Sequence, residues 1–255
     1  MTLLSAVRLK QVVGIGGLLV LLAVGEASGS VLATYEPPGV LTTSVSGASV
    51  VTFDALPLGV DSNVPFMNGA LQIGTFDLVH VYSGSPYGGA NGSQYITPVD
   101  PGTTLTLVNP AAYFGIWWSA GDPSNVIDFY SGSALVAQFT TANILQDLPN
   151  TYKGNPSGPY KGDDPGEPYA YLNFFGQGGT TWDRMVFSNG QFESDNYASR
   201  TAPWNPGVNG PFPGVVFESI NGSTETPETA PEPATLGFSG VALMALAFAA
   251  HRLRR

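Results

Sequence analysis

Short apolar and aromatic runs alternate with clusters of Gly, Pro, Asn and Asp through the middle of the chain. Several runs have a period of two: Ile127 and Phe129 fall on one side of their run, and Asp128 and Tyr130 fall on the other. This period is typical of a β-strand with one buried face. The pattern predicts strands at residues 49–56, 71–82, 103–108, 113–118, 126–130, 134–140, 169–175, 182–187 and 215–220.

A helical period is missing from these runs, and only one helical turn is expected, at residues 142–147. Eight or more strands without alternating helices favour packed antiparallel layers over a parallel α/β fold. We therefore predict an all-β protein, with a single jelly-roll-like β-sandwich over residues 30–222 that is flanked at both ends by sorting segments.

The first 29 residues have the order of a secretory signal peptide. Arg8 and Lys10 precede an apolar stretch at residues 12–24, and small residues follow at 27–30. An N-terminal anchor is the alternative, but about 13 apolar residues reach only about 20 Å across a hydrocarbon layer of about 30 Å. We therefore expect export and removal of residues 1–29.

The C-terminal end predicts a temporary hold at a membrane. Residues 223–233 form an acidic, Pro-rich linker, and residues 234–255 join an apolar stretch to a basic end with Arg252, Arg254 and Arg255. The arginines are expected on the cytoplasmic side, with the folded domain outside. The apolar stretch reaches about 22 Å, which is short for permanent spanning.

The tripeptide Pro231, Glu232 and Pro233, followed by the apolar stretch and the basic end, resembles the PEP-CTERM sorting signal. The resemblance implies that exosortase, a membrane-embedded processing enzyme, recognises the tripeptide, cuts near it and releases the protein or transfers it to the cell surface. It also implies a Gram-negative bacterium that makes extracellular polysaccharide, with the protein in its periplasm, at its surface or in the biofilm matrix.

The central domain resembles one group of exosortase-dependent surface proteins, common in cyanobacteria and other Gram-negative bacteria. The segments that carry the resemblance are residues 113–119, 125–130, 166–175, 182–187 and 192–196. The implied fold is a jelly-roll-like sandwich, in agreement with the strand pattern. The resemblance brings no known activity with it.

Composition and charge narrow the chemistry. The chain has 32 Gly, 21 Pro and no Cys, so disulfides, thiol nucleophiles and Cys-ligated metal sites are excluded. Between residues 30 and 228, 17 acidic residues stand against four basic ones, a net charge of −13. Nucleic acid is therefore not expected as a partner, whereas divalent cations and neutral sugars suit such a surface.

Catalysis has little support in the sequence. His80 is the one histidine between the two end segments, it lies in a strand-like run, and no Gly-x-Ser-x-Gly motif accompanies it. Carboxylate pairs for sugar hydrolysis are available but have no distinctive spacing. We therefore predict that the domain is not an enzyme, and a glycan hydrolase or lyase is the third interpretation.

Two groups of acidic and amide side chains could supply the six to eight oxygens that Ca²⁺ takes. The first is Asp54 with Asp195 and Asn196, if the first strand and a late strand lie side by side, and the second is Asp163, Asp164 and Glu167 in the loop of residues 149–168. The alternative is that these residues cap turns or remain solvated. Calcium is the one cofactor hypothesis.

Aromatic residues indicate a second kind of site. Trp117 and Trp118 are adjacent in a strand, so one should face inward and one outward, and Tyr160 and Trp204 lie in Gly- and Pro-rich loops. An exposed aromatic ring stacks on the apolar face of a sugar, which predicts a carbohydrate site. Core packing is the alternative for these residues.

The first functional interpretation is an exported, exosortase-processed surface or matrix protein without catalytic activity, associated with exopolysaccharide or biofilm. The alternative is a calcium-dependent carbohydrate-binding module. The expected partners are exosortase, the secretion machinery, the membrane during processing and extracellular polysaccharide.

The mature protein should lack the residues before about Ser30 and after about Pro233, because neither sorting segment can pack into a water-soluble sandwich. Intact-mass spectrometry of protein purified from its native host checks both ends. A surface form that still carries residues 236–255 would contradict the retention signal.

Overall fold

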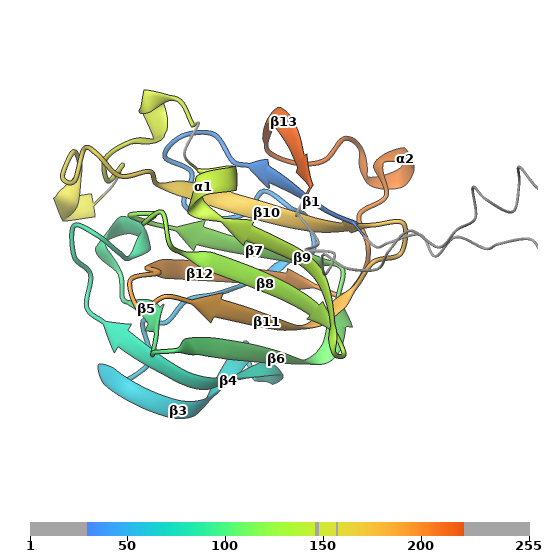
Figure 1. Ribbon diagram of the computed structural model, residues 1–255, viewed down its shortest axis with the longest axis horizontal. Coiled ribbons are helices and arrows are strands. Elements are labelled where there is room, and N and C mark those ends of the chain that lie inside the picture. Colours follow the sequence, from blue (N-terminus) through green and yellow to red (C-terminus); the bar gives the residue numbers. More distant parts are fainter. Residues whose placement is uncertain (1–29, 146–147, 157, 222–255) are drawn as a thin grey trace, which may run out of the picture.

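In the computed structural model, which describes residues 30–145, 148–156 and 158–221, β-strands are joined by loops and very short helices (Figure 1). The strands are β1 (Ser30–Tyr35), β2 (Ser49–Val51), β3 (Gly59–Asn68), β4 (Leu71–Tyr82), β5 (Tyr95–Pro98), β6 (Gly102–Ala111), β7 (Tyr113–Trp118), β8 (Val126–Ser131), β9 (Ala134–Thr140), β10 (Ala170–Gln177), β11 (Trp182–Ser188), β12 (Ser194–Arg200) and β13 (Val215–Asn221). The helices are η1 (Ala90–Gly92), α1 (Thr141–Ile144), η2 (Asn150–Tyr152), η3 (Gly158–Tyr160) and α2 (Pro206–Asn209). The predicted all-β class is confirmed.

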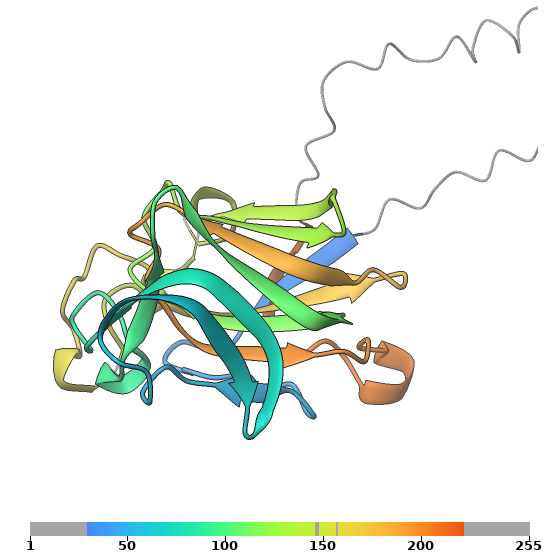
Figure 2. The same ribbon diagram turned by 90° about the horizontal axis from the view of Figure 1, so that it is seen from below.

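The strands belong to one antiparallel sheet in the order β13-β1-β10-β7-β12-β5-β4-β6-β11-β8-β9, with β2 added at β12 and β3 at β4. This sheet curls until it is nearly closed into a barrel (Figure 2). The predicted jelly-roll-like sandwich is a more specific topology than this strand order establishes, and it stays a prediction.

The interior of the curled sheet is filled mainly by aromatic rings. Tyr197, on β12, lies at their centre, with its ring centroid 5.2–6.3 Å from those of five phenylalanines. These are Phe53, Phe66, Phe76, Phe114 and Phe187. Most of the pairs are edge-to-face or tilted, which is the arrangement that aromatic rings favour. The rings therefore join strands that are far apart in the sequence.

The alternating pattern located β4, β7 and β9 to the residue, but it missed β1, β3, β5 and β12. β3 is largely polar and exposed because it pairs with β4 alone, at a branch of the sheet. β12 reads SDNYASR and lies between β7 and β5, where its first two polar residues, Ser194 and Asp195, are buried. A strand that is covered by loops does not need an apolar outer face, so the pattern does not reveal it.

The strand registers place the two ends of the described chain together. Ser30 pairs with Gln177, and Leu32 pairs with Asn221. The other end of β10 begins at Ala170, opposite Trp118 of β7. The eight residues of β10 span about 25 Å at about 3.3 Å each, and this length separates the chain ends from the loops beyond Trp118.

Among the described residues, no helix is both long and apolar enough to cross a membrane. The predicted signal peptide, residues 1–29, and the predicted linker and sorting segment, residues 223–255, lie outside the described residues.

Replacing Tyr197 by Ala should lower the free energy of unfolding by about 3–5 kcal/mol, because it removes a fully buried ring from the centre of the core. Tyr87, whose side chain is 54% exposed, is the matched control. Tyr87→Ala should change the free energy of unfolding by about 0.5 kcal/mol or less. Urea unfolding followed by circular dichroism compares the two. Equal losses would contradict the central position of Tyr197.

Candidate functional site

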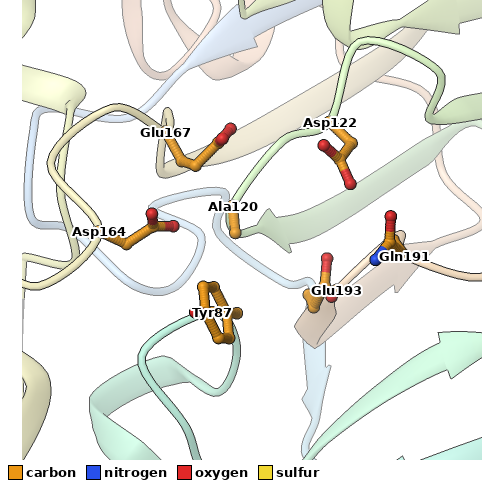
Figure 3. A pocket seen from close by; sticks show the side chains of 7 residues that line it. All are labelled: Tyr87, Ala120, Asp122, Asp164, Glu167, Gln191 and Glu193. Carbon is orange, nitrogen blue, oxygen red and sulfur yellow. The ribbon is translucent and has the colours of Figure 1, made fainter.

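Loops from distant parts of the sequence gather at the end of the sheet where β7 ends and β10 begins, and we call this the loop end. They follow β4, β7, β9 and β11, and their strand partners fix their positions. Between them lies a cavity of about 240 Å³, called the acidic pocket below. Its lining residues are Tyr87, Ala120, Asp122, Asp164, Glu167, Gln191 and Glu193 (Figure 3).

The loop of residues 83–94 is held by the carboxylate of Asp195. The backbone N–H of Ala90 and the hydroxyl of Ser93 donate to Asp195 Oδ2 at 2.9 and 2.6 Å, and the N–H of Asn196 donates to Oδ1 at 2.6 Å. Burial raises the pKa of Asp195 to about 6, although these three hydrogen bonds oppose the rise. Asp195 is therefore a structural anchor for the loop that carries Tyr87.

The first predicted calcium group is brought together only in part. Asp54 raises the pKa of Asp195 through its charge, so the two carboxylates are neighbours, as expected from adjacent strands. However, Asp54 Oδ1 accepts from the N–H of Gln94 at 3.0 Å, and the side-chain nitrogen of Asn196 donates to the carbonyl of Leu41 at 2.8 Å. These side chains fasten loops to one another.

The second predicted group is divided by its loop. Asp164 and Glu167 line the acidic pocket, whereas Asp163 is exposed and does not. The hydroxyl of Tyr169 lies 3.0 Å from Asp164 Oδ2 and 2.8 Å from the carbonyl oxygen of Pro86. This hydroxyl ties the loop of residues 149–168 to the loop that carries Tyr87.

The same two loops are joined again farther out. The hydroxyl of Tyr160 donates to the carbonyl of Gly84 at 2.9 Å, and the side-chain N–H of Asn155 donates to the carbonyl of Pro86 at 2.9 Å. Tyr160 is half-buried and its hydroxyl is engaged, so its observed role is to brace the loops. Hydrogen bonds between the loops therefore hold the walls of the acidic pocket in place.

The carboxylates that surround the pocket repel one another. Burial, together with the charges of Asp122, Glu167 and Asp164, raises the pKa of Glu193 to about 8. Burial and the charges of Asp164 and Asp122 also raise the pKa of Glu167, while Lys153 opposes this rise. The Glu193 carboxyl therefore keeps its proton to a higher pH than an ordinary glutamate, and in that form it can donate one hydrogen bond.

Within the described parts of the chain, no three His, Asp or Glu side chains are grouped closely enough to hold a metal ion as they stand. The acidic pocket is thus an open ring of carboxylates around a space, and the side chains point toward that space from separate loops (Figure 3). Such a ring offers hydrogen-bond acceptors, one acid proton at Glu193 and a strongly negative potential.

The predicted aromatic residues occupy other places. Trp117 and Trp118 lie on opposite faces of β7 as expected, but their side chains are only 1% and 0% exposed because loops cover the outer face. Trp204 is 9% exposed, and its ring nitrogen donates to the carbonyl of Gly210 at 3.0 Å. The expectation that one adjacent tryptophan would face solvent is wrong, and none of these three rings presents a face to a sugar.

Sequence reasoning missed the aromatic residue that does face the pocket. Tyr87 is 54% exposed and lines the pocket beside Asp164 and Glu193. It also missed Asp122, Gln191 and Glu193. One signal could have found them, since Asp122 closely follows β7 and Glu193 directly precedes β12, and these strand ends are neighbours in the sheet.

Comparison of the chain with protein-family models finds no match, and neither does comparison with curated proteins.

The free energy of unfolding should fall by about 2 kcal/mol between pH 5 and pH 8, less than the full shift implies because Glu193 remains partly solvated. Below a pKa of about 8 the folded protein keeps a proton on Glu193 that the unfolded chain releases above its ordinary value, so stability is lost as pH rises through this window. Urea unfolding at several pH values measures the slope.

Glu193→Gln mimics the protonated acid and should reduce this pH dependence, leaving the part that Asp195 adds below about pH 6 because its pKa is also raised. Asp163→Asn, a change in an exposed neighbour that does not line the pocket, is the control and should leave the slope as it is. A wild-type slope that survives Glu193→Gln unchanged would assign the pH dependence to other groups.

Proposed function

We propose that this chain is an exported surface or matrix protein of the exosortase-dependent type, and that its acidic pocket binds a glycan without catalytic turnover. The observation that carries the proposal is the pairing of one exposed aromatic ring, Tyr87, with hydrogen-bonding side chains around a single cavity. The sorting part rests on the resemblance of residues 231–255 to a PEP-CTERM signal. A jelly-roll-like sandwich belongs to the same proposal.

The lining matches the chemistry of a sugar ring. A pyranose has apolar C–H faces, on which the ring of Tyr87 can stack, and hydroxyl groups around its edge that donate to carboxylates. Asp122, Asp164 and Glu167 offer such acceptors, and the amide of Gln191 both donates and accepts. The volume of about 240 Å³ is below that of common drug-sized pockets, so it suits one sugar unit rather than a long segment.

The placement of the pocket agrees with display at a surface. The two ends of the described chain, Ser30 and Asn221, lie at one end of β10. The pocket lies beyond the other end of this strand. A domain attached through its C-terminal side would therefore hold the pocket away from the attachment point by about 25 Å. This geometry would leave the pocket free to meet extracellular polysaccharide.

Calcium is the second candidate ligand for the same pocket. Burial is the main cause of the raised pKa values of Glu193 and Glu167, and the charges of neighbouring carboxylates add to it. A divalent cation would relieve that added repulsion, and Asp122 and Asp164 would supply further oxygen ligands. Binding would then require small movements of the loops and would release a proton from Glu193. In this form the glycan hydroxyls would complete the coordination of the ion.

The same carboxyls also keep a glycan hydrolase or lyase as the third candidate, because a raised carboxyl pKa suits a general acid. We place binding first because it needs only the ring and the acceptors that line the cavity. Nucleic acid remains excluded from the proposal, since the domain is strongly acidic.

Wild-type protein should bind neutral oligosaccharides on a glycan array. Tyr87→Ala should weaken that binding about five- to tenfold, because an aromatic contact of about 1–1.5 kcal/mol is lost. Tyr82→Ala is the matched control, since Tyr82 is also exposed, at 39%, but does not line the pocket. Binding that Tyr87→Ala leaves intact would contradict this site.

The same binding measurement is repeated with millimolar calcium and with a chelator. Calcium dependence that is lost in Asp164→Asn assigns the ion to the pocket, while equal binding in both conditions leaves a metal-free glycan site. Release of shortened sugars during incubation would replace the binding proposal with the hydrolase.

A further inference from the structure

A second cavity lies next to the acidic pocket and has a different chemistry. It measures about 470 Å³, and we call it the apolar groove. Its walls include Pro123, Ala142, Leu145 and Pro168, with Thr141 and Lys153 as the polar members other than Glu167. The groove has more apolar than polar surface, unlike the acidic pocket.

The two cavities are adjacent and share part of their walls. Glu167 lines both of them. Gly121 lines the groove, while Ala120 and Asp122 on either side of it line the acidic pocket. The N–H of Gly121 donates to the carbonyl of Pro168 at 3.3 Å, which fixes this boundary. A ligand in the acidic pocket therefore has a neighbouring space for its next unit or for a substituent.

Thr141, which lines the groove, has a buried hydroxyl without a hydrogen-bond partner. Its side chain is 4% exposed, and Oγ1 has no hydrogen-bond partner, although a buried hydroxyl without a partner costs free energy. The methyl carbon Cγ2 faces Gly121, since a Cβ on Gly121 would lie 3.2 Å from it. One staggered step about the Cα–Cβ bond moves Oγ1 to the position that Cγ2 occupies and moves Cγ2 to the position of the Cβ hydrogen. This step would present the hydroxyl to the groove.

We propose that the apolar groove binds the acetamido group of an N-acetylated sugar, an inference that rests on glycan binding by the acidic pocket. An acetamido group has a methyl, a carbonyl acceptor and an N–H donor. The groove supplies an exposed apolar wall at Pro123 and Ala142. It also supplies donors at Thr141 and Lys153 and an acceptor at Glu167.

The neutral charge of an acetamido group also suits this place. The domain is strongly acidic, and Lys153 lies close enough to Glu167 to lower its pKa. An anionic substituent would meet the repulsion of the neighbouring carboxylates, whereas a neutral amide meets a donor and an acceptor at once. The groove therefore selects among neutral sugars by their N-acetyl substituent.

Calorimetric titration with chitotetraose and cellotetraose tests the proposal, because both are β-1,4-linked glucose-type tetramers and only the first carries acetamido groups. Wild-type protein should bind chitotetraose at least tenfold more tightly. Thr141→Val and Lys153→Met should each reduce this preference about fivefold, as the loss of one hydrogen bond does, without changing the affinity for cellotetraose. Lys161→Met, an exposed lysine of the same loop that does not line the groove, is the control.

Thr141→Val also separates a ligand contact from a folding contact. Because Oγ1 has no partner, the isosteric Val should leave the melting temperature unchanged or raise it. Gly121→Ala is the second variant. Its Cβ would lie 2.8 Å from Leu145 Cδ1 and 3.3 Å from Pro168 Cγ, so it should narrow the groove and abolish the preference.

The failures are distinguishable. Equal affinity of wild-type protein for the two tetramers, or a preference that survives both Thr141→Val and Lys153→Met, overturns the acetamido proposal and leaves the glycan pocket standing. Absence of binding to either tetramer at millimolar concentration, or binding that Tyr87→Ala does not weaken, overturns both proposals.

Discussion

The buried carboxylate of Asp195 is the interaction on which the loop end depends. It accepts hydrogen bonds from Ala90 and Ser93 of the loop that carries Tyr87 and from the backbone of Asn196 in its own strand. Without it, the N–H of Ala90 would lose its acceptor, at a cost of about 1–3 kcal/mol, and the hydroxyl of Ser93 would keep only the carbonyl of Ala90. The loop in turn receives the hydroxyl contacts of Tyr160 and Tyr169, so one carboxylate orders two loops.

The aromatic core is connected to the loop end through the same strand, β12. Tyr197 lies two residues after Asp195 on β12, and in a strand such residues share a face unless the register shifts. The register of β12 against β7 does shift between Asp195 and Ala198. This irregularity, with Asn196 at a φ of 48°, lets Asp195 reach the loops while Tyr197 enters the core. A single strand therefore links the packing of the interior to the geometry of the pocket.

The acidic pocket and the apolar groove illustrate how function can arise at the edge of a stable sheet. The sheet supplies fixed strand ends, and the loops supply carboxyls whose burial and mutual repulsion the fold tolerates, as the raised pKa of Glu193 indicates. Groups that raise one another's pKa values are costly for stability, so a ligand that neutralises them or accepts from them gains affinity. In the neighbouring groove, the unpartnered hydroxyl of Thr141 also lowers the stability of the fold, by a smaller amount.

The sequence by itself determined the all-β class and the bounds of β4, β7 and β9, because alternation and turn residues are local properties. It placed Asp164 and Glu167 in a candidate site for the same reason. Only the tertiary structure decided that Trp117 is covered, that Asp195 is an anchor and that Glu193 faces Asp122 across a cavity. Those outcomes depend on which loops lie together at one end of the sheet. The strand order and register determine this, and they pair residues that are more than 70 positions apart in the sequence.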